Sequence, residues 1–137
     1  MTAWLSLLGM ARRAGAVVIG EESLMEAAGN HKLRLVLLAK DAGEHTQRRM
    51  SRLESDKLPV VVLPDDKAEL GGAIGFANAA AVGVTDLGFA SAVVNKLTAV
   101  HGDYAPVAQT LAQRQSKALR RKADTVKNGK KSKRRKP

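Results

Sequence analysis

The sequence contains no cysteine among its 137 residues. This absence excludes a disulfide framework, a thiol nucleophile and a zinc site with cysteine ligands. Aromatic residues are also scarce, because Trp, Tyr and Phe make up 3% of the chain although hydrophobic residues make up 45%. A core must therefore be built mainly from Leu, Val, Ile and Ala, and the length fits one domain.

Long apolar runs are missing too. No stretch approaches the ~20 consecutive apolar residues of a membrane-spanning helix. The N-terminal segment MTAWLSLLGMARRAGA carries its arginines after the apolar run, whereas a secretory signal carries positive charge before it. We therefore expect a cytoplasmic protein with no membrane partner.

The chain also lacks recognisable motifs for catalysis and metal binding. Its three histidines, His31, His45 and His101, lie far apart and without metal-ligand spacing. The segment GGAIG at 71–75 falls within an expected helix, so close packing explains it better than nucleotide binding. We expect no catalytic residue, metal, cofactor or small-molecule substrate. An enzyme stays open as an alternative that a deep pocket with convergent polar groups would support.

The net charge of +10 is concentrated at the C-terminal end. Residues 1–98 contain 11 Lys/Arg and 11 Asp/Glu, whereas residues 99–137 contain 12 Lys/Arg and only Asp103 and Asp124 as acids. Such a segment binds polyanions through counterion release, with little sequence preference. Membrane attraction would need apolar side chains among the lysines, so the pattern favours nucleic acid over lipid or a solubility tail.

Hydrophobic patterns predict short strands that alternate with helices. Asp66 followed by Glu69 forms a capping box at the start of one helix. The alternation predicts an α/β fold with helices on both faces of a small sheet, a domain over 1–98 and a basic tail over 99–137. The tail is expected to be disordered from Asn128 and partly helical before it. The expected strands are 16–19, 33–40, 59–63 and 79–84, and the expected helices are 4–14, 21–29, 44–57, 66–75 and the segment after Asp86.

Four segments together resemble a known family. LLGMARRAGAVVIGEESLMEAA, KLRLVLLAKDA, LPVVVLPDDKAELGGAIG and AAAVGVTDLGFA follow one another in this order. They resemble the ribosomal protein L-seven-Ae / L-thirty-e (Pelota-like) superfamily, and most of all its bacterial YlxQ-related branch, over roughly residues 4–95. The resemblance implies a three-layer α/β/α sandwich around a small mixed sheet. It also implies non-enzymatic RNA binding, often to kink-turns, in ribosomes and other ribonucleoproteins, without a cofactor.

The resemblance places an RNA site at a strand-to-helix turn with the pattern G-x-N-E-x-x-K, helped by a K-x-x-L-G helix start and the loop before the last strand. Gly20 matches the glycine, Lys67 the helix start, and Asn78 the polar end of the loop. The three polar readers are replaced, by Glu22, Ser23 and Glu26.

These replacements change the chemistry of the turn. Glutamates at 22 and 26 only accept hydrogen bonds and repel phosphate, so an ordinary kink-turn is not expected, although a base amino group could still be read there. Glu21 and Glu22 also favour the positive end of the helix dipole, which is a purely structural interpretation.

Basic residues are expected to contact phosphate around this turn and along the tail. The candidates near the turn are Arg12, Arg13, Lys32, Lys40 and Lys67. The candidates in the tail are Arg114, Lys117, Arg120, Arg121, Lys122, Lys130, Lys131, Lys133, Arg134, Arg135 and Lys136.

The sequence therefore predicts a non-enzymatic RNA-binding protein, ribosomal or ribosome-associated, with ribosomal RNA as partner and a monomer as the favoured state. The alternative is a protein-interaction module of a ribonucleoprotein. It would dock a basic protein surface at Glu21, Glu22 and Glu26, and its tail would bind nucleic acid without specificity.

Overall fold

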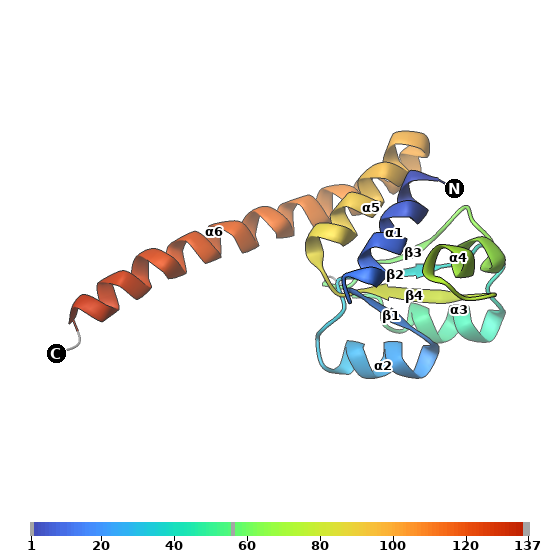
Figure 1. Ribbon diagram of the computed structural model, residues 1–137, viewed down its shortest axis with the longest axis horizontal. Helices are drawn as coiled ribbons and strands as arrows, with labels where there is room; N and C mark the ends of the chain where they lie inside the picture. Colours follow the sequence, from blue (N-terminus) through green and yellow to red (C-terminus); the bar gives the residue numbers. More distant parts are fainter. Residues whose placement is uncertain (1, 56, 136–137) are drawn as a thin grey trace.

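Four short strands form one mixed sheet between the helices of the globular part (Figure 1). The computed structural model describes residues 2–55 and 57–135, with side chains up to Arg121. The sheet order is β1-β4-β2-β3, with β4 antiparallel to both β1 and β2, and β2 parallel to β3. The strands are β1 (Val17–Ile19), β2 (Leu35–Leu38), β3 (Val60–Val62) and β4 (Ala81–Val84).

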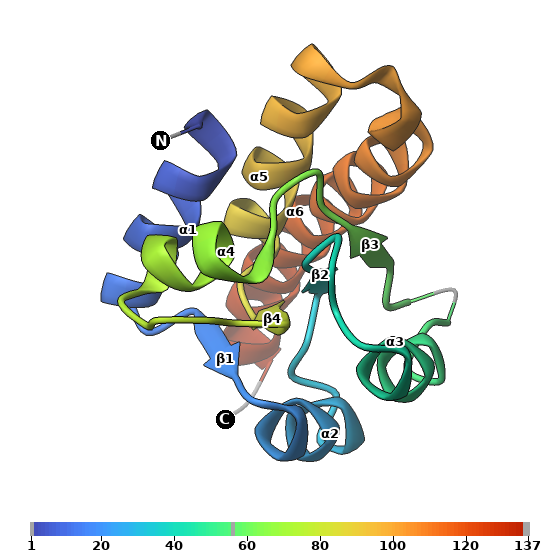
Figure 2. The same cartoon turned by 90° about the vertical axis from the view of Figure 1, so that its right-hand side faces the viewer.

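Helices cover both faces of this sheet, as expected (Figure 2). Each face has its own apolar cluster, one built around Leu8, Leu70 and Leu97 and the other around Leu24 and Met50. The inner strands β2 and β4 are buried at every position, so the α/β/α sandwich with a small mixed sheet is confirmed. The first face carries α1 (Ala3–Arg13), α4 (Lys67–Ile74), α5 (Leu87–Val100) and α6 (Ala105–Arg135), and the second carries α2 (Glu21–Gly29) and α3 (Glu44–Ser51).

The helix starts follow the side-chain chemistry of the sequence. The Asp66 side chain accepts from the Glu69 backbone N–H at 2.8 Å, and Glu69 returns the bond to the Asp66 backbone, which confirms the capping box. Helix α3, expected to reach residue 57, ends at Ser51. An isolated bridge between Ser55 and Leu58 turns the chain there toward β3, and the helix cannot continue through it.

The segment 99–137, which we expected to be a tail, begins within the folded domain. The one-turn helix η1 (Gly102–Tyr104) leads into α6, where Ala108 and Leu111 are buried in the same cluster as α1 and α5. The packed core therefore continues past the expected boundary at Thr98, to Leu111. Two buried side chains about one turn apart give α6 an apolar stripe that faces α5.

Helix α6 continues to Arg135, past Asn128, where we expected regular structure to end. A helix whose first turns are fixed by packing propagates at low cost through residues such as Lys, Arg, Gln and Ala. No helix in the described parts of the chain is long and apolar enough to cross a bilayer.

Candidate nucleic-acid interface

One end of the sheet gathers most of the residues that the sequence singles out. Strands β1, β2 and β3 finish there and β4 begins there, as the pairs Ile19–Val82, Leu38–Ala81 and Leu38–Val62 show. Figure 2 views the molecule from this end. We call the four connecting segments the loop rim, which comprises residues 20–23, 39–41, 64–67 and 76–80.

Hydrogen bonds from backbone N–H groups tie three segments of the loop rim together. The Lys40 N–H donates to the Asp65 carbonyl at 2.8 Å, and the Lys67 N–H donates to Asp41 Oδ1 at 2.8 Å. The Ala79 N–H donates to the Lys67 carbonyl at 3.0 Å. Three of the four rim segments are therefore held by one another, namely 39–41, 64–67 and 76–80.

The structure brings most of the predicted turn residues onto the loop rim. Glu26 lies on α2, one turn beyond Glu22, and is exposed. Arg12 reaches the rim from α1, where its guanidinium lies 5.4 Å from the centre of the Phe76 ring. The predicted residues on the rim itself are Gly20, Glu21, Glu22, Ser23, Lys40, Lys67 and Asn78.

Two predicted cations are not tied to this surface. Lys32 lies at the opposite end of the sheet, since two residues later the Arg34 N–H donates to the Val84 carbonyl at the far end of β4. Arg13 is exposed at the end of α1. Lys40 therefore lies at the same end of the sheet as the turn at Gly20, whereas Lys32 lies at the opposite end.

Gly20 shapes the turn from β1 into α2. Its backbone has φ 96° and ψ 141°, and its position is the N-cap of α2, with no side-chain cap. Side chains with a Cβ rarely adopt this conformation. The glycine of the expected RNA-reading turn is therefore required by the backbone itself.

Gly71 explains the glycine-rich segment at 71–75. A Cβ added at Gly71 would lie 2.7 Å from the Asn78 Cα, so only glycine lets the 76–80 loop approach α4 this closely. Close packing, rather than nucleotide binding, accounts for this glycine. Its contact fixes the loop that carries Asn78.

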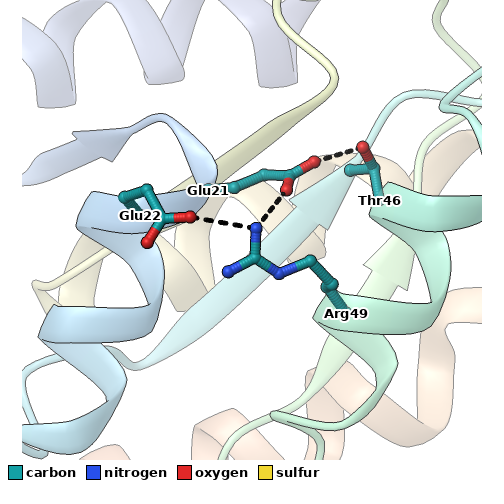
Figure 3. A network of polar contacts seen from close by, with 4 residues as sticks. All are labelled: Glu21, Glu22, Thr46 and Arg49. Carbon is teal, nitrogen blue, oxygen red and sulfur yellow. Dashed lines mark hydrogen bonds and ion pairs between the residues drawn. The ribbon is translucent and has the colours of Figure 1, made fainter.

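The two glutamates of the turn are held by α3 (Figure 3). Arg49 Nη1 lies 2.8 Å from Glu21 Oε2 and 3.1 Å from Glu22 Oε1, and Thr46 Oγ1 donates to Glu21 Oε1. The hydrogen bond from Thr46, with Arg49 beside it, lowers the pKa of Glu21. The same contacts, that with Glu22 foremost, raise the pKa of Arg49.

Sequence reasoning missed Thr46 and Arg49. They stand three residues apart in a helix with one buried residue, Met50, and so share a face of α3. Their spacing in the sequence indicates that the two side chains share a face of the helix, but it does not indicate that this face lies against α2.

A buried carboxyl supports the loop rim from below. Asp65 is 4% exposed, and its Oδ2 accepts from Trp4 Nε1 at 2.6 Å. Burial raises the pKa of Asp65 above its ordinary value, although the Trp4 hydrogen bond acts in the opposite direction. The Asp65 carbonyl also accepts from Lys40. Asp65 therefore links α1 to the rim, while the adjacent Asp66 caps α4.

The predicted tail cations lie on α6. Arg114 donates from Nη1 to the Lys57 carbonyl, whereas Lys117, Arg120 and Arg121 are exposed. Figure 1 shows α6 extending beyond the domain with its C-terminal end far from α3 and α4. The side chains of Lys122, Lys130, Lys131, Lys133, Arg134 and Arg135 lie outside the described side chains, and Lys136 lies outside the described residues.

Metal-binding chemistry has no support within the described structure. Among those residues, no three His, Cys, Asp or Glu side chains lie together in a way that could hold a metal ion.

A curated relative decides the family. The RNA-binding protein YlxQ of Bacillus subtilis (strain 168) is 37% identical over 98 residues, which cover 69% of this chain and 94% of the relative. The chain belongs to the YlxQ family. A second YlxQ, an RNA-binding protein of Enterococcus faecium, is 37% identical over 46 residues, or 34% of this chain and 45% of that protein. No protein-family profile matches the chain.

Solved structures share the fold of this YlxQ-family chain. A protein of unknown function from Bacillus halodurans C matches with a TM-score of 0.66 and 36% identity, over 70% of this chain and 97% of that one. The Giardia lamblia 15.5kD RNA binding protein matches with a TM-score of 0.57 and 18% identity, over 72% and 84%. The predicted YlxQ-related branch is confirmed by the Bacillus subtilis relative, and the likeness to the Giardia lamblia protein shows a shared fold.

Proposed function

We propose that this YlxQ-family protein is a non-enzymatic RNA-binding protein, ribosomal or ribosome-associated, which contacts ribosomal RNA through the loop rim. The observation that carries the proposal is the convergence of the Gly20 turn, Lys40, Lys67 and Asn78 on one end of the sheet. The names of the YlxQ relatives, both RNA-binding proteins, support it.

The loop rim offers the two kinds of group that RNA recognition needs. Lys40 is exposed and Lys67 half-buried, and their ammonium groups suit phosphate. The exposed Asn78 amide both donates and accepts, and the exposed Glu22 carboxylate accepts. Such groups read the edges of unpaired bases, which is how proteins commonly recognise RNA sequence.

The RNA is expected to differ from an ordinary kink-turn. A kink-turn reader at the positions of Glu22 and Glu26 would carry an amide and a lysine, whereas both carboxylates here repel phosphate. We therefore expect the protein to prefer another structured or single-stranded feature of ribosomal RNA over a kink-turn of equal length.

A binding experiment on the full chain tests the role of the loop rim. The probes are fragmented bacterial ribosomal RNA and poly(U) of matched length. Lys67→Ala and Lys40→Ala should each weaken binding to the ribosomal fragments several-fold, because each removes a cation from the rim. Lys32→Ala is the matched control, since Lys32 lies at the other end of the sheet. An equal loss in the Lys32→Ala variant would refute the rim as the site.

Removing residues 122–137 separates the contribution of the tail. The truncation should weaken binding to both probes and flatten the dependence of affinity on salt, because fewer counterions are released. The preference for ribosomal fragments should survive. If it is lost, the tail rather than the rim selects the RNA.

The interaction-module alternative gives a different result. Glu22→Lys should change the preference among RNAs if the rim binds RNA, and should abolish capture of a basic protein partner if the turn is a docking patch. The contacts of Glu21 with Thr46 and Arg49 weigh against docking, since they already satisfy one carboxylate of the patch. Crosslinking RNA to the protein in cells, followed by sequencing and ribosome sedimentation, tests the ribosomal role and the cytoplasmic location.

A further inference from the structure

The turn at the proposed RNA site is acidic. Glu21 and Glu22 begin α2, and Glu26 follows one turn later. A phosphate that approaches these carboxylates is repelled unless a cation offsets them. The cation that contacts them in the described structure is Arg49 of α3, through the same nitrogen for both Glu21 and Glu22.

We propose that Arg49 is a positioning residue for RNA binding, which neutralises and fixes the acidic turn so that RNA can approach the loop rim. The inference rests on the proposed function, because it assigns a role to Arg49 at that same surface. Arg49 is not placed in direct contact with RNA.

The contacts divide the two glutamates into different roles. Thr46 and Arg49 together hold Glu21, whose side chain is 27% exposed, whereas Glu22 meets Arg49 alone and is 86% exposed (Figure 3). Glu21 therefore anchors the turn to α3. Glu22 keeps its second carboxylate oxygen, Oε2, outside the described contacts.

The burial of Arg49 fits this role. Its side chain is 24% exposed, so the guanidinium is held between α2 and α3 instead of extending into solvent. The N-cap Gly20 has no side chain to fix the first turn of α2. The link from α3 supplies that restraint, because one nitrogen of Arg49 joins two successive residues of the turn.

Arg48 offers a matched control one residue away. It is exposed on the same helix and takes part in no ion pair among the described residues. Arg48→Ala and Arg49→Ala remove the same charge from the same helix. They differ in whether the lost cation touches the acidic turn.

Binding of the full-length variants to fragmented bacterial ribosomal RNA tests the proposal. Arg49→Ala should weaken binding on the order of tenfold, because two carboxylates near the RNA lose their partner. Arg48→Ala should weaken it less than about twofold. Glu21→Gln and Glu22→Gln, added to Arg49→Ala, should restore most of the affinity, since neutral side chains need no cation. Binding to poly(U) through the tail should change little in every variant.

The rescue separates neutralisation from the other roles of an arginine. If the glutamine substitutions fail to restore binding, or if Arg48→Ala and Arg49→Ala weaken it equally, the proposal is overturned. Thermal unfolding of each variant, followed by circular dichroism, identifies a loss of fold. Should Arg49→Ala unfold, Arg49→Gln replaces it in the same comparison, because it removes the charge but keeps part of the aliphatic stem and a polar end.

The outcome also distinguishes this inference from the proposed function. If Lys67→Ala weakens binding to the ribosomal fragments but Arg49→Ala does not, only the role of Arg49 is wrong. If Lys67→Ala and Lys40→Ala leave binding unchanged, the loop rim is not the site and the proposed function is wrong.

Discussion

The conformation of Gly20 makes a quantitative prediction for Gly20→Ala. A Cβ at position 20 would meet no heavy atom within 4 Å, so the substitution causes no clash. Its cost comes from the backbone alone, because φ 96° with ψ 141° is a region that side chains with a Cβ rarely enter. Such strain costs about 2 kcal/mol. For a domain of this size that corresponds to a fall of about 8 °C in the unfolding midpoint.

Urea and thermal unfolding measure this cost directly. Gly72→Ala is the control, because Gly72 lies within α4, also has open space around its Cβ position, and has no positive φ. There, alanine should raise stability by roughly 0.5–1 kcal/mol through its better helix propensity. If Gly20→Ala is as stable as the parent protein, the turn does not need the glycine and the reasoning from its backbone angles is refuted.

Two other predictions concern the core and the buried carboxyl. Leu111→Ala should lower the free energy of unfolding by about 3 kcal/mol, measured in urea, because Leu111 is fully buried. Leu119→Ala on the same helix should lower it by less than about 0.5 kcal/mol, because Leu119 is 64% exposed. Equal losses would mean that α6 is not packed on the domain. Burial raises the pKa of Asp65 in the folded protein above its unfolded value of 3.8. The protonated side chain therefore contributes its full stabilisation below pH 3.8, and this contribution is lost as the pH rises through the folded-state pKa. Asp65→Asn, which keeps an acceptor for Trp4, should therefore gain stability relative to the parent as the pH rises in denaturation series, and a difference independent of pH would contradict this.

Local patterns in the sequence were sufficient to predict the strands β1 to β4 and the helices α1 to α5, although not the end of α3 or the extent of α6. The capping box at Asp66 and Glu69 depends on residues three apart, and the structure confirms it. The buried strands β2 and β4 were visible as continuous apolar runs, because strands covered on both faces need no polar side. Features that are decided within a few residues of each other were therefore accessible to sequence reasoning.

Long-range arrangement was not accessible in the same way. The contacts of Arg49 with Glu21 and Glu22 join residues 28 and 27 positions apart, and they depend on how two helices lie on the sheet. Lys32 and Lys40 flank the same strand, so they must lie at opposite ends of it, although both were grouped as candidates near the turn. The direction of a strand, once recognised, separates such pairs.

The start of α6 also has a consequence for how molecules of this protein meet one another. Strand β3 is the last in the sheet, and the Val62 carbonyl accepts from Tyr104 Oη at 2.6 Å, while Arg114 donates to the Lys57 carbonyl just before the strand. An uncovered outer strand is a template for pairing with a second chain. The junction between η1 and α6 thus occupies two backbone acceptors in and beside β3, which leaves fewer of them to pair with a second chain, and the positive charge of the segment that follows would also keep the molecules apart.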